Sequence, residues 1–365
     1  METDIAASVG ECGVLRRVYA AAVQTFHNHL VFTILVLLYA SAMLLAAHLY
    51  NVEHRVRLSF YSVDLMTMLL MFGGVYCVMH VAYMLAKVRP EHPLQFAVQE
   101  IRHNCLQRER LVNALPVVLL LPVFMSSFTS FKIMLPEINP FSWDELFAAW
   151  DRQIHAGSQP WQWLHPVFGY PVMTTVVNFF YNSWFFVMFS VVLWQAFTLR
   201  RPVLRMRFLL TFVLLWILLG TVGAIVLSSA GPCYYGRLVD GPDIYRPLME
   251  YLRSADTHCP VWALDAQQML WESYTNEKAH EVAGISAMPS MHVSMVVLFA
   301  LIGWKTNRRA GLSLTIYALI ILIGCVHLAW HYAIDAYLAI VLTCLIWWIV
   351  GKMQKRYAPQ PQVKD

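Results

Sequence analysis

Two short polar motifs lie in an otherwise strongly apolar half of the sequence, and both contain histidine. One is Pro-Ser-Met-His, which ends at His292, and the other places His331 four residues before Asp335. Residues four apart share one face of a helix, so this imidazole and this carboxylate are expected to be neighbours. A carboxylate that holds Nδ1–H orients the Nε2 lone pair toward an electrophile, while a second, protonated imidazole delivers a proton to a leaving oxygen. Phosphorus is a natural electrophile for this pair, because a phosphoryl group can pass through a phosphohistidine.

The same residues are compatible with two other kinds of chemistry. His327, His331 and Asp335 would offer three ligands to an iron or zinc ion if one helix carried all of them. An iron oxygenase of membranes would, however, need more clustered histidines, so we predict no metal and no cofactor. A transporter would use these groups as a proton relay, because ionisable groups at membrane depth are costly and usually functional. His327 by itself is equally well explained as an interfacial side chain beside Trp330.

The elements that must position these residues are membrane helices. Of the 365 residues, 59% are hydrophobic and only 13% are charged, which is typical of a polytopic membrane protein. A helix needs about 20 apolar residues to cross the roughly 30 Å hydrocarbon layer. The sequence predicts eight such runs, at 31–49, 65–86, 112–130, 172–199, 208–230, 290–304, 312–328 and 334–351. We therefore predict an all-α integral membrane protein with about eight transmembrane helices.

The positions of lysine and arginine predict how the helices cross the membrane. With a cytoplasmic N-terminus, the inside segments would carry 18 of the 26 Lys and Arg residues, although the outside segments are longer. Both termini are therefore predicted to be cytoplasmic, and both histidine motifs to face the extracytosolic side. The formal net charge of +4 is explained by these inside anchors beside anionic lipid headgroups, so no nucleic-acid partner is expected.

A long outside segment contains a predicted surface helix. In the stretch 139–164, Ser142 and Glu145 have the spacing of a capping box, and the following residues predict an amphipathic helix. Asp144 and Asp151 would lie away from its apolar face. That apolar face would consist of Leu146, Phe147, Trp150 and Ile154. We interpret the segment as an interfacial amphipathic helix that anchors the chain in the headgroup layer and could roof a site there.

Cys233 and Cys259 lie in one outside segment, where an oxidising compartment would allow them to pair. We predict a disulfide between them, which would contribute about 3 kcal/mol on the chain-entropy model. The seven cysteines include no Cys-x-x-Cys pair, so the sequence shows no zinc framework.

Pro-Ser-Met-His at 289–292, followed some forty residues later by His-x-x-x-Asp at 331–335, resembles the type 2 phosphatidic-acid phosphatase superfamily. The phrases His-Tyr-Ala-Ile-Asp and Ser-Ser-Ala-Gly-Pro-Cys-Tyr-Tyr look more like one branch of it. That branch includes the inositolphosphotransferase known as fungal inositol phosphorylceramide synthase and its bacterial relatives. The stretch Phe-Ser-Trp-Asp-Glu-Leu-Phe-Ala-Ala-Trp-Asp-Arg is also similar to bacterial members.

The resemblance covers roughly 172–352 and implies how the chain is organised. It implies a phosphatidic-acid-phosphatase-like catalytic core of six helices, which we place at 112–352. A two-helix membrane segment, 1–111, would precede this core, and a polar cytoplasmic tail, 353–365, would follow it. The protein is then expected in a bacterial inner membrane, with its active site at the extracytosolic surface.

By the same resemblance, His331 would be the nucleophile, Asp335 its orienting carboxylate, and His292 the acid that protonates the leaving group. Ser290 and nearby backbone groups would contact the phosphate oxygens. The lipid phosphatases of the superfamily also carry two phosphate-binding cations. One belongs to a motif of Lys, six residues and Arg-Pro, whose spacing we do not find, and the other to a Ser-Arg pair that is Gly-Cys in this chain.

Other groups must then stabilise the phosphate, because its charge is poorly stabilised in a low-dielectric site without positive partners. The candidates are His327, Arg237, Tyr234, Tyr235, Asn178, Tyr181 and Asn182. The loss of both cations favours a phosphodiester donor, which carries less negative charge, over a terminal phosphomonoester.

We predict a membrane lipid phosphotransferase, of the kind found in sphingolipid metabolism, that works through a phosphohistidine intermediate. It would move a phosphoryl headgroup from a lipid phosphoester donor to a lipid or polyol acceptor, with membrane lipids as its partners. The alternative is a lipid-phosphate or polyprenyl-phosphate phosphatase that uses the same two histidines and aspartate. Activity in the presence of a chelator would separate both of these enzymes from a metal enzyme.

Overall fold

The structure is a computed structural model that describes residues 2–90, 92, 95, 96, 98–100, 107–275 and 284–357. Within these residues the secondary structure consists of helices and contains no strand, which confirms the predicted all-α membrane fold. Helix α16 (Ala333–Tyr357) extends into the predicted polar tail, and the rest of that tail, 358–365, lies outside the described residues.

Seven helical segments of the described chain are long and apolar enough to cross a membrane. They are Val23–Leu49 in α1 (Glu2–Leu49), Glu53–Val88 with α2 (Phe60–Tyr83), α4 (Arg108–Ile138), Pro171–Phe197 with α7 (Pro171–Asn182) and α8 (Trp184–Phe197), Pro202–Val226 with α9 (Pro202–Ile217) and α10 (Ala224–Val226), α15 (Arg308–His327), and Ala333–Arg356 in α16. The predicted run 290–304 corresponds to α14 (Met291–Thr306), which has only 16 residues. This eighth segment is shorter than the roughly 20 residues that a complete crossing needs.

Helix α14 lies in the middle of the bundle and packs against α15, α16, α9 and α8. Phe299 of α14 lies 6.4 Å from Phe208 of α9 between ring centroids, and both side chains are fully buried. Inside a bilayer such contacts hold helices together by van der Waals packing rather than by removing apolar surface from water. The packing fixes the N-terminal end of α14, where His292 lies.

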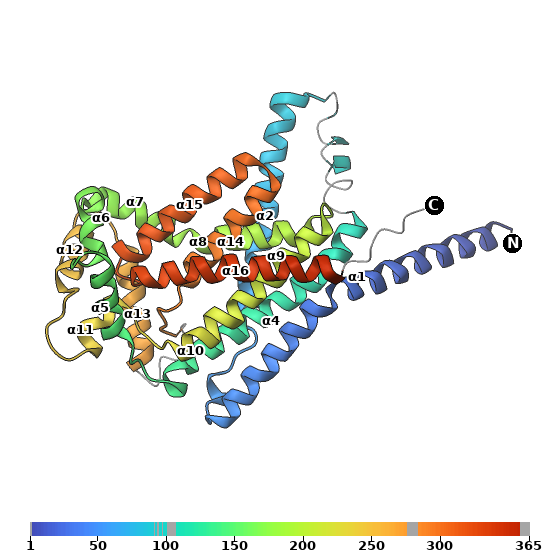
Figure 1. Ribbon diagram of the computed structural model, residues 1–365. Coiled ribbons are helices and arrows are strands. Elements are labelled where there is room, and N and C mark those ends of the chain that lie inside the picture. Colours follow the sequence, from blue (N-terminus) through green and yellow to red (C-terminus); the bar gives the residue numbers. More distant parts are fainter. Residues whose placement is uncertain are drawn as a thin grey trace.

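Short helices cover one end of the bundle (Figure 1). They are α5 (Asp144–Ile154), α6 (Pro160–Phe168), α11 (Tyr235–Leu238), α12 (Arg246–Asp256) and α13 (Trp262–Thr275). This end is where α15 finishes and α16 begins, whereas the N-terminal end of α1 lies on the opposite side of the molecule (Figure 1). The outer helices therefore lie over the segment that carries His331.

The start of α5 differs from the prediction. The N-cap residue of α5 is Trp143, and it makes no side-chain cap hydrogen bond. The predicted capping box of Ser142 and Glu145 is wrong, because the backbone N–H groups of residues 142 and 143 both donate to Ser228 O. The segment is therefore fixed to the chain that follows α10 before the helix begins.

The two faces of α5 also differ from the predicted pattern. Its exposed large apolar side chains are Leu146, Trp150 and Ile154, which agrees with an interfacial helix. Phe147, however, is fully buried, and so are Asp144 and Asp151, which are only 3% and 1% exposed. The acidic side of this helix therefore faces the protein interior rather than water.

Candidate active site

The loop between α15 and α16 turns His331 into the protein interior. Ala329 in this loop has a φ of +59°, a left-handed conformation that ends the helix. The backbone N–H of His331 then donates to Cys325 O at 2.9 Å. Helix α15 ends at His327 and α16 begins at Ala333, close to the end and the start of the two predicted runs, so His327, His331 and Asp335 do not share one helix.

The imidazole of His331 is held on its Nδ1 side. Nδ1 lies 2.8 Å from Ala287 O and 3.4 Å from Asp335 Oδ2. Both neighbours are acceptors, so Nδ1 carries the hydrogen and Nε2 presents its lone pair. Asp335 lies beside His331 as predicted, although the nearer partner of the imidazole is the Ala287 carbonyl.

Burial sets the charge of His331, whose side chain is 6% exposed. Desolvation lowers the pKa of His331 to about 3, and the hydrogen bond to Ala287 opposes this effect only in part. The imidazole is therefore neutral at pH 7. Its Nε2 lone pair is available to an electrophile without prior loss of a proton.

His292 lies in the first turn of α14 and faces the same space as His331. Its ring stacks on Tyr181, with centroids 4.6 Å apart, and contacts Trp184 at 4.5 Å. The centroids of the two imidazoles are 5.7 Å apart. The structure thus brings together the three residues predicted to be catalytic, and their roles in catalysis stay predictions.

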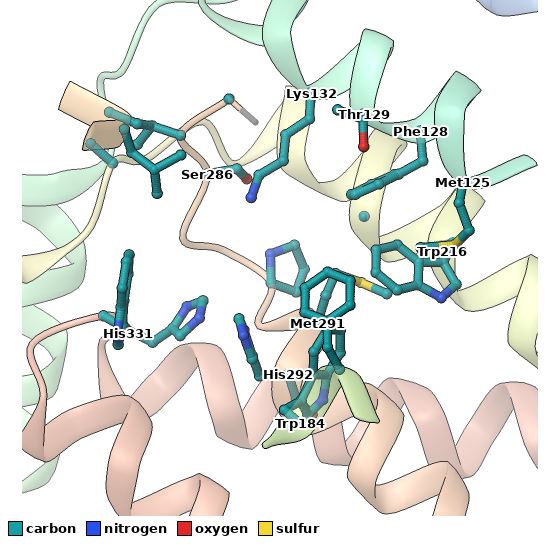
Figure 2. Close-up of a pocket in the computed structure, with 18 of the residues that line it drawn as sticks. Met125, Phe128, Thr129, Lys132, Trp184, Trp216, Ser286, Met291, His292 and His331 are labelled. Carbon is teal, nitrogen blue, oxygen red and sulfur yellow. The ribbon is translucent and has the colours of Figure 1, made fainter. Parts of the chain in front are cut away.

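Both histidines line one cavity of about 240 Å³ (Figure 2). Much of its wall is apolar and includes Met125, Phe128, Trp184, Phe185, Trp216 and Met291. Its polar lining includes Tyr61, Thr129, Lys132, Asn182, Tyr234 and Ser286. This combination suits a substrate that has a polar group beside a hydrocarbon part.

Lys132 of α4 is a functional candidate that the sequence reasoning missed. Figure 2 shows its side chain reaching from α4 toward Ser286, into the cavity that the two histidines line. The backbone of Gly284 packs closely against the Lys132 carbonyl, where any side chain at position 284 would clash. The cavity therefore contains a cation close to the imidazoles.

The spacing around Lys132 explains why it was overlooked. Six residues separate it from Asn139, which precedes Pro140, so the chain reads Lys, six residues, Asn-Pro. This spacing resembles that of the basic motif, with Asn139 at the position where the motif has arginine. Asn139 Nδ2 donates to Ile225 O at 2.7 Å and ties the end of α4 to α10.

Three of the predicted phosphate-binding residues line the cavity: Tyr181, Asn182 and Tyr234. The Tyr234 hydroxyl already donates to Gln267 O at 2.9 Å, and Asn182 Nδ2 donates to Asn178 O at 2.8 Å. None of the three carries a positive charge. Within the described chain, Lys132 is the cation in this cavity wall.

Five other predicted residues lie outside the cavity wall: Ser290, His327, Arg237, Tyr235 and Asn178. Ser290 is the N-cap of α14, and its hydroxyl accepts a backbone N–H of that helix at 3.4 Å. His327 Nε2 is hydrogen-bonded to Thr174 Oγ1 at 2.9 Å. Arg237 lies over the ring of Trp271 at 4.8 Å. The structure does not bring these side chains to the surface that would receive a phosphate.

The predicted disulfide is not formed in the structure, where Cys233 and Cys259 both carry free thiols. Different elements anchor the two residues. The backbone N–H of Cys233 donates to Ala329 O at 2.9 Å, beside the His331 loop, whereas that of Cys259 donates to Ala255 O in α12.

The described residues contain no group of three or more His, Cys, Asp or Glu side chains arranged to hold a metal ion. The three ligands of the metal alternative lie on α15, on the loop and on α16 instead of on one helix. His327 is directed to Thr174, away from the other two.

Comparison with known proteins identifies a matching family. A family model described as the PAP2 superfamily matches residues 145–349, which is more than half of the 365 residues. The matched segment contains His292, His331 and Asp335, whereas Lys132 precedes it. No curated protein and no solved structure matches the chain.

Proposed function

Because the chain belongs to the PAP2 superfamily, whose members are phosphatases and phosphotransferases, we propose that it is a membrane lipid phosphotransferase. It moves a phosphoryl headgroup from a lipid phosphoester donor to a lipid or polyol acceptor. One observation carries the proposal: two imidazoles 5.7 Å apart face a cavity with a large apolar wall. The branch that includes inositol phosphorylceramide synthase is the one that this reaction fits.

The first step forms a phosphohistidine. His331 Nε2 attacks phosphorus, the bond from phosphorus to the leaving oxygen breaks, and that oxygen takes a proton from His292. In this proposal His292 holds that proton only when the anionic donor is bound, because an adjacent negative charge favours the protonated imidazole. His331 becomes positively charged as the new bond forms. The Ala287 carbonyl and the Asp335 carboxylate stabilise this charge through Nδ1–H, at 2.8 and 3.4 Å.

The second step transfers the phosphoryl group to the acceptor. His292, now neutral, accepts the proton of the acceptor hydroxyl while its oxygen attacks phosphorus and the bond to His331 Nε2 breaks. Both imidazoles return to their starting states, so the reaction needs no other proton donor or acceptor. A phosphatase runs the same two steps with water in place of the acceptor.

The charge of the cavity favours a phosphodiester donor. Lys132 supplies one positive charge, and Asn139 and Cys325 stand where the superfamily's lipid phosphatases have arginines. A phosphodiester carries one negative charge and a phosphomonoester up to two, so a cavity whose permanent cation is Lys132 suits the phosphodiester better. This balance separates the proposal from the alternative, a phosphatase of lipid or polyprenyl phosphates.

The proposed location follows from the distribution of basic residues and from the side on which the site lies. We place both termini in the cytoplasm and the site at the extracytosolic face of a bacterial inner membrane. The short outer helices then lie at the outer headgroup layer. A lipid headgroup would reach the histidines from that layer, with its hydrocarbon part along the apolar wall.

The test is acceptor dependence. Purified protein in liposomes is given a labelled phosphodiester lipid, with and without an added alcohol acceptor, and His331→Ala is the control. A transferase forms a labelled acceptor product and little free phosphoryl headgroup. Release of free phosphate from a lipid phosphomonoester at the same rate with or without acceptor would instead establish the phosphatase.

A further inference from the structure

We infer that α5 is a positioning element of the active site, in which Asp151 and Asp144 hold the loop and helix start that carry His331 and Asp335. The inference rests on the proposed function, because it assigns a role in that reaction. Neither acid touches the cavity. They act through the backbone of the segments that carry the reacting groups.

Asp151 caps α16 from a different helix. Its Oδ2 accepts the backbone N–H of Ala333 at 2.7 Å, and its Oδ1 accepts that of Ile334 at 2.9 Å. The first N–H groups of a helix have no partner within the helix, so an outside carboxylate satisfies them and matches the helix dipole. Ala333 lies between His331 and Asp335, so this one carboxylate fixes the backbone that supports both.

Asp144 holds the His331 loop from its other side. Its carboxylate accepts the backbone N–H groups of Ala230 and Gly231, at 2.9 and 2.8 Å, and the Tyr332 hydroxyl at 2.8 Å. Tyr332 directly follows His331. The loop at 230–231 lies against the His331 loop, because a Cβ at Gly231 would be 2.6 Å from Trp330 O. Asp144 therefore joins the two loops.

The two acids act as one unit because they are seven residues apart, which places them two turns apart on one face of α5. Phe147 lies between them, fully buried, and its ring lies 6.0 Å from that of Tyr332 between centroids. Within the described ranges neither carboxylate forms a salt bridge. Burying an acid without a cation costs free energy. The hydrogen bonds that the two carboxylates accept from the loops and from the start of α16 must therefore be well formed to offset this desolvation cost.

The consequence for catalysis is geometric. The angle at which Nε2 of His331 meets phosphorus depends on the loop and on the start of α16. A displacement of about 1 Å in a reacting group costs about 10²-fold in rate. Loss of the hydrogen bonds made by Asp144 and Asp151 should therefore slow the chemical step and leave substrate affinity nearly unchanged.

Titration of Asp151 gives a signature that a purely structural role lacks. Burial raises the pKa of Asp151 to about 6, and its backbone hydrogen bonds to Ala333 and Ile334 oppose the rise. The titratable groups that face it are His155 just after α5, Asp335 and Tyr337 on α16, and Tyr245 before α12. A protonated carboxyl accepts both N–H groups less well, so the rate should fall as pH falls through about 6.

This loss is not unfolding caused by the same group. Its pKa in the folded chain is above the ordinary value of 3.8, so its protonation favours the folded state over the unfolded state as pH falls. A matched loss of folded protein near pH 6 would therefore need another cause. Rate and folded fraction can be measured side by side.

The experiment measures phosphoenzyme formation in a single turnover with full-length protein in liposomes. Asp151→Asn keeps the shape but places an amide NH₂ against a backbone N–H. Its control is Asp256→Asn, because Asp256 makes the same kind of bond, to Val261 N at 2.7 Å, away from the cavity. We expect Asp151→Asn to form the phosphoenzyme about 10- to 100-fold more slowly than the wild type, with KM within about twofold. Its rate should not fall as the pH is lowered through about 6. Asp256→Asn should label at the wild-type rate.

Tyr332→Phe removes only the hydroxyl bonded to Asp144. It tests the positioning role of α5 if Asp151→Asn does not fold. We expect it to label about three- to tenfold more slowly. Wild-type labelling rates in both variants, or in the folded fraction of either one, would overturn the inference. Failure of the proposed function looks different, because the wild-type protein would then form no phosphoenzyme, or His331→Ala would retain it.

Discussion

Changing Asp335 to Asn should slow phosphoenzyme formation by about 10²- to 10³-fold while the protein stays folded. Asp335 Oδ2 lies 3.4 Å from His331 Nδ1, and His331 becomes positive when Nε2 bonds to phosphorus. Two unit charges at that separation attract by about 5 kcal/mol at an effective dielectric constant of about 20. The positive charge is spread over the ring, so about 3 to 4 kcal/mol is lost, and about 1.4 kcal/mol corresponds to tenfold in rate.

The structure also sets an upper limit on this effect. In a serine-protease triad the corresponding change costs about 10⁴ in rate, partly because the histidine adopts the wrong tautomer. Here the Ala287 carbonyl lies closer to Nδ1, at 2.8 Å, and keeps the hydrogen on that atom. Asn at position 335 should therefore remove charge without changing the tautomer.

The assay mixes a labelled donor with protein in liposomes, stops the reaction at set times and counts the label bound to protein. Asp265→Asn is the control, since Asp265 is an exposed acid of α13. Thermal unfolding of each variant is recorded in the same liposomes. A rate within about threefold of the wild type would refute the electrostatic argument. It would leave Asp335 as a cap whose carboxylate accepts the Tyr332 N–H at 3.3 Å.

Lys132→Met should lower donor turnover by about 10²- to 10³-fold, whereas Lys132→Arg retains most of it, because the charge stabilises the transferring phosphoryl group. Equal turnover in Met and Arg variants would show that this charge is not used. His292→Ala should stop turnover of a lipid donor but still allow labelling by a donor with an acidic leaving group, which needs no proton. Loss of labelling with both donors would contradict the acid role. EDTA should leave the rate unchanged, and restoration of an EDTA-inhibited rate by added zinc or iron would refute the phosphohistidine route.

Part of the site was accessible from the sequence because its residues lie next to helix ends. His292 and His331 each border an apolar run, and the alternation of sides places both borders at the same end of the bundle. The i, i+4 spacing of His331 and Asp335 survives as a contact even though the helix does not begin until Ala333. The same spacing failed for His327, because Ala329 reverses the chain in between.

The residues that the sequence reasoning missed share a different cause. Lys132 was overlooked because the motif was required to end in arginine, and nothing in apolar periodicity distinguishes a cavity lysine from an anchoring one. Asp144 and Asp151 were expected away from the apolar face of the helix, because acids on amphipathic helices usually lie on the polar face. Their burial depends on backbone N–H groups of residues 230–231 and 333–334, which lie far away in sequence and leave no side-chain pattern.

The position of Lys132 determines which segment of the chain must be transferred to carry the complete cavity into another protein. The segment that matches the superfamily begins at residue 145, but the cavity takes its cation from α4, which ends at Ile138. A chimaera that received only residues 145–349 would gain both imidazoles and lose the charge that faces them. A segment that carries the complete cavity must therefore include α4. Substitutions in that helix should affect the cavity as directly as substitutions in the histidine motifs.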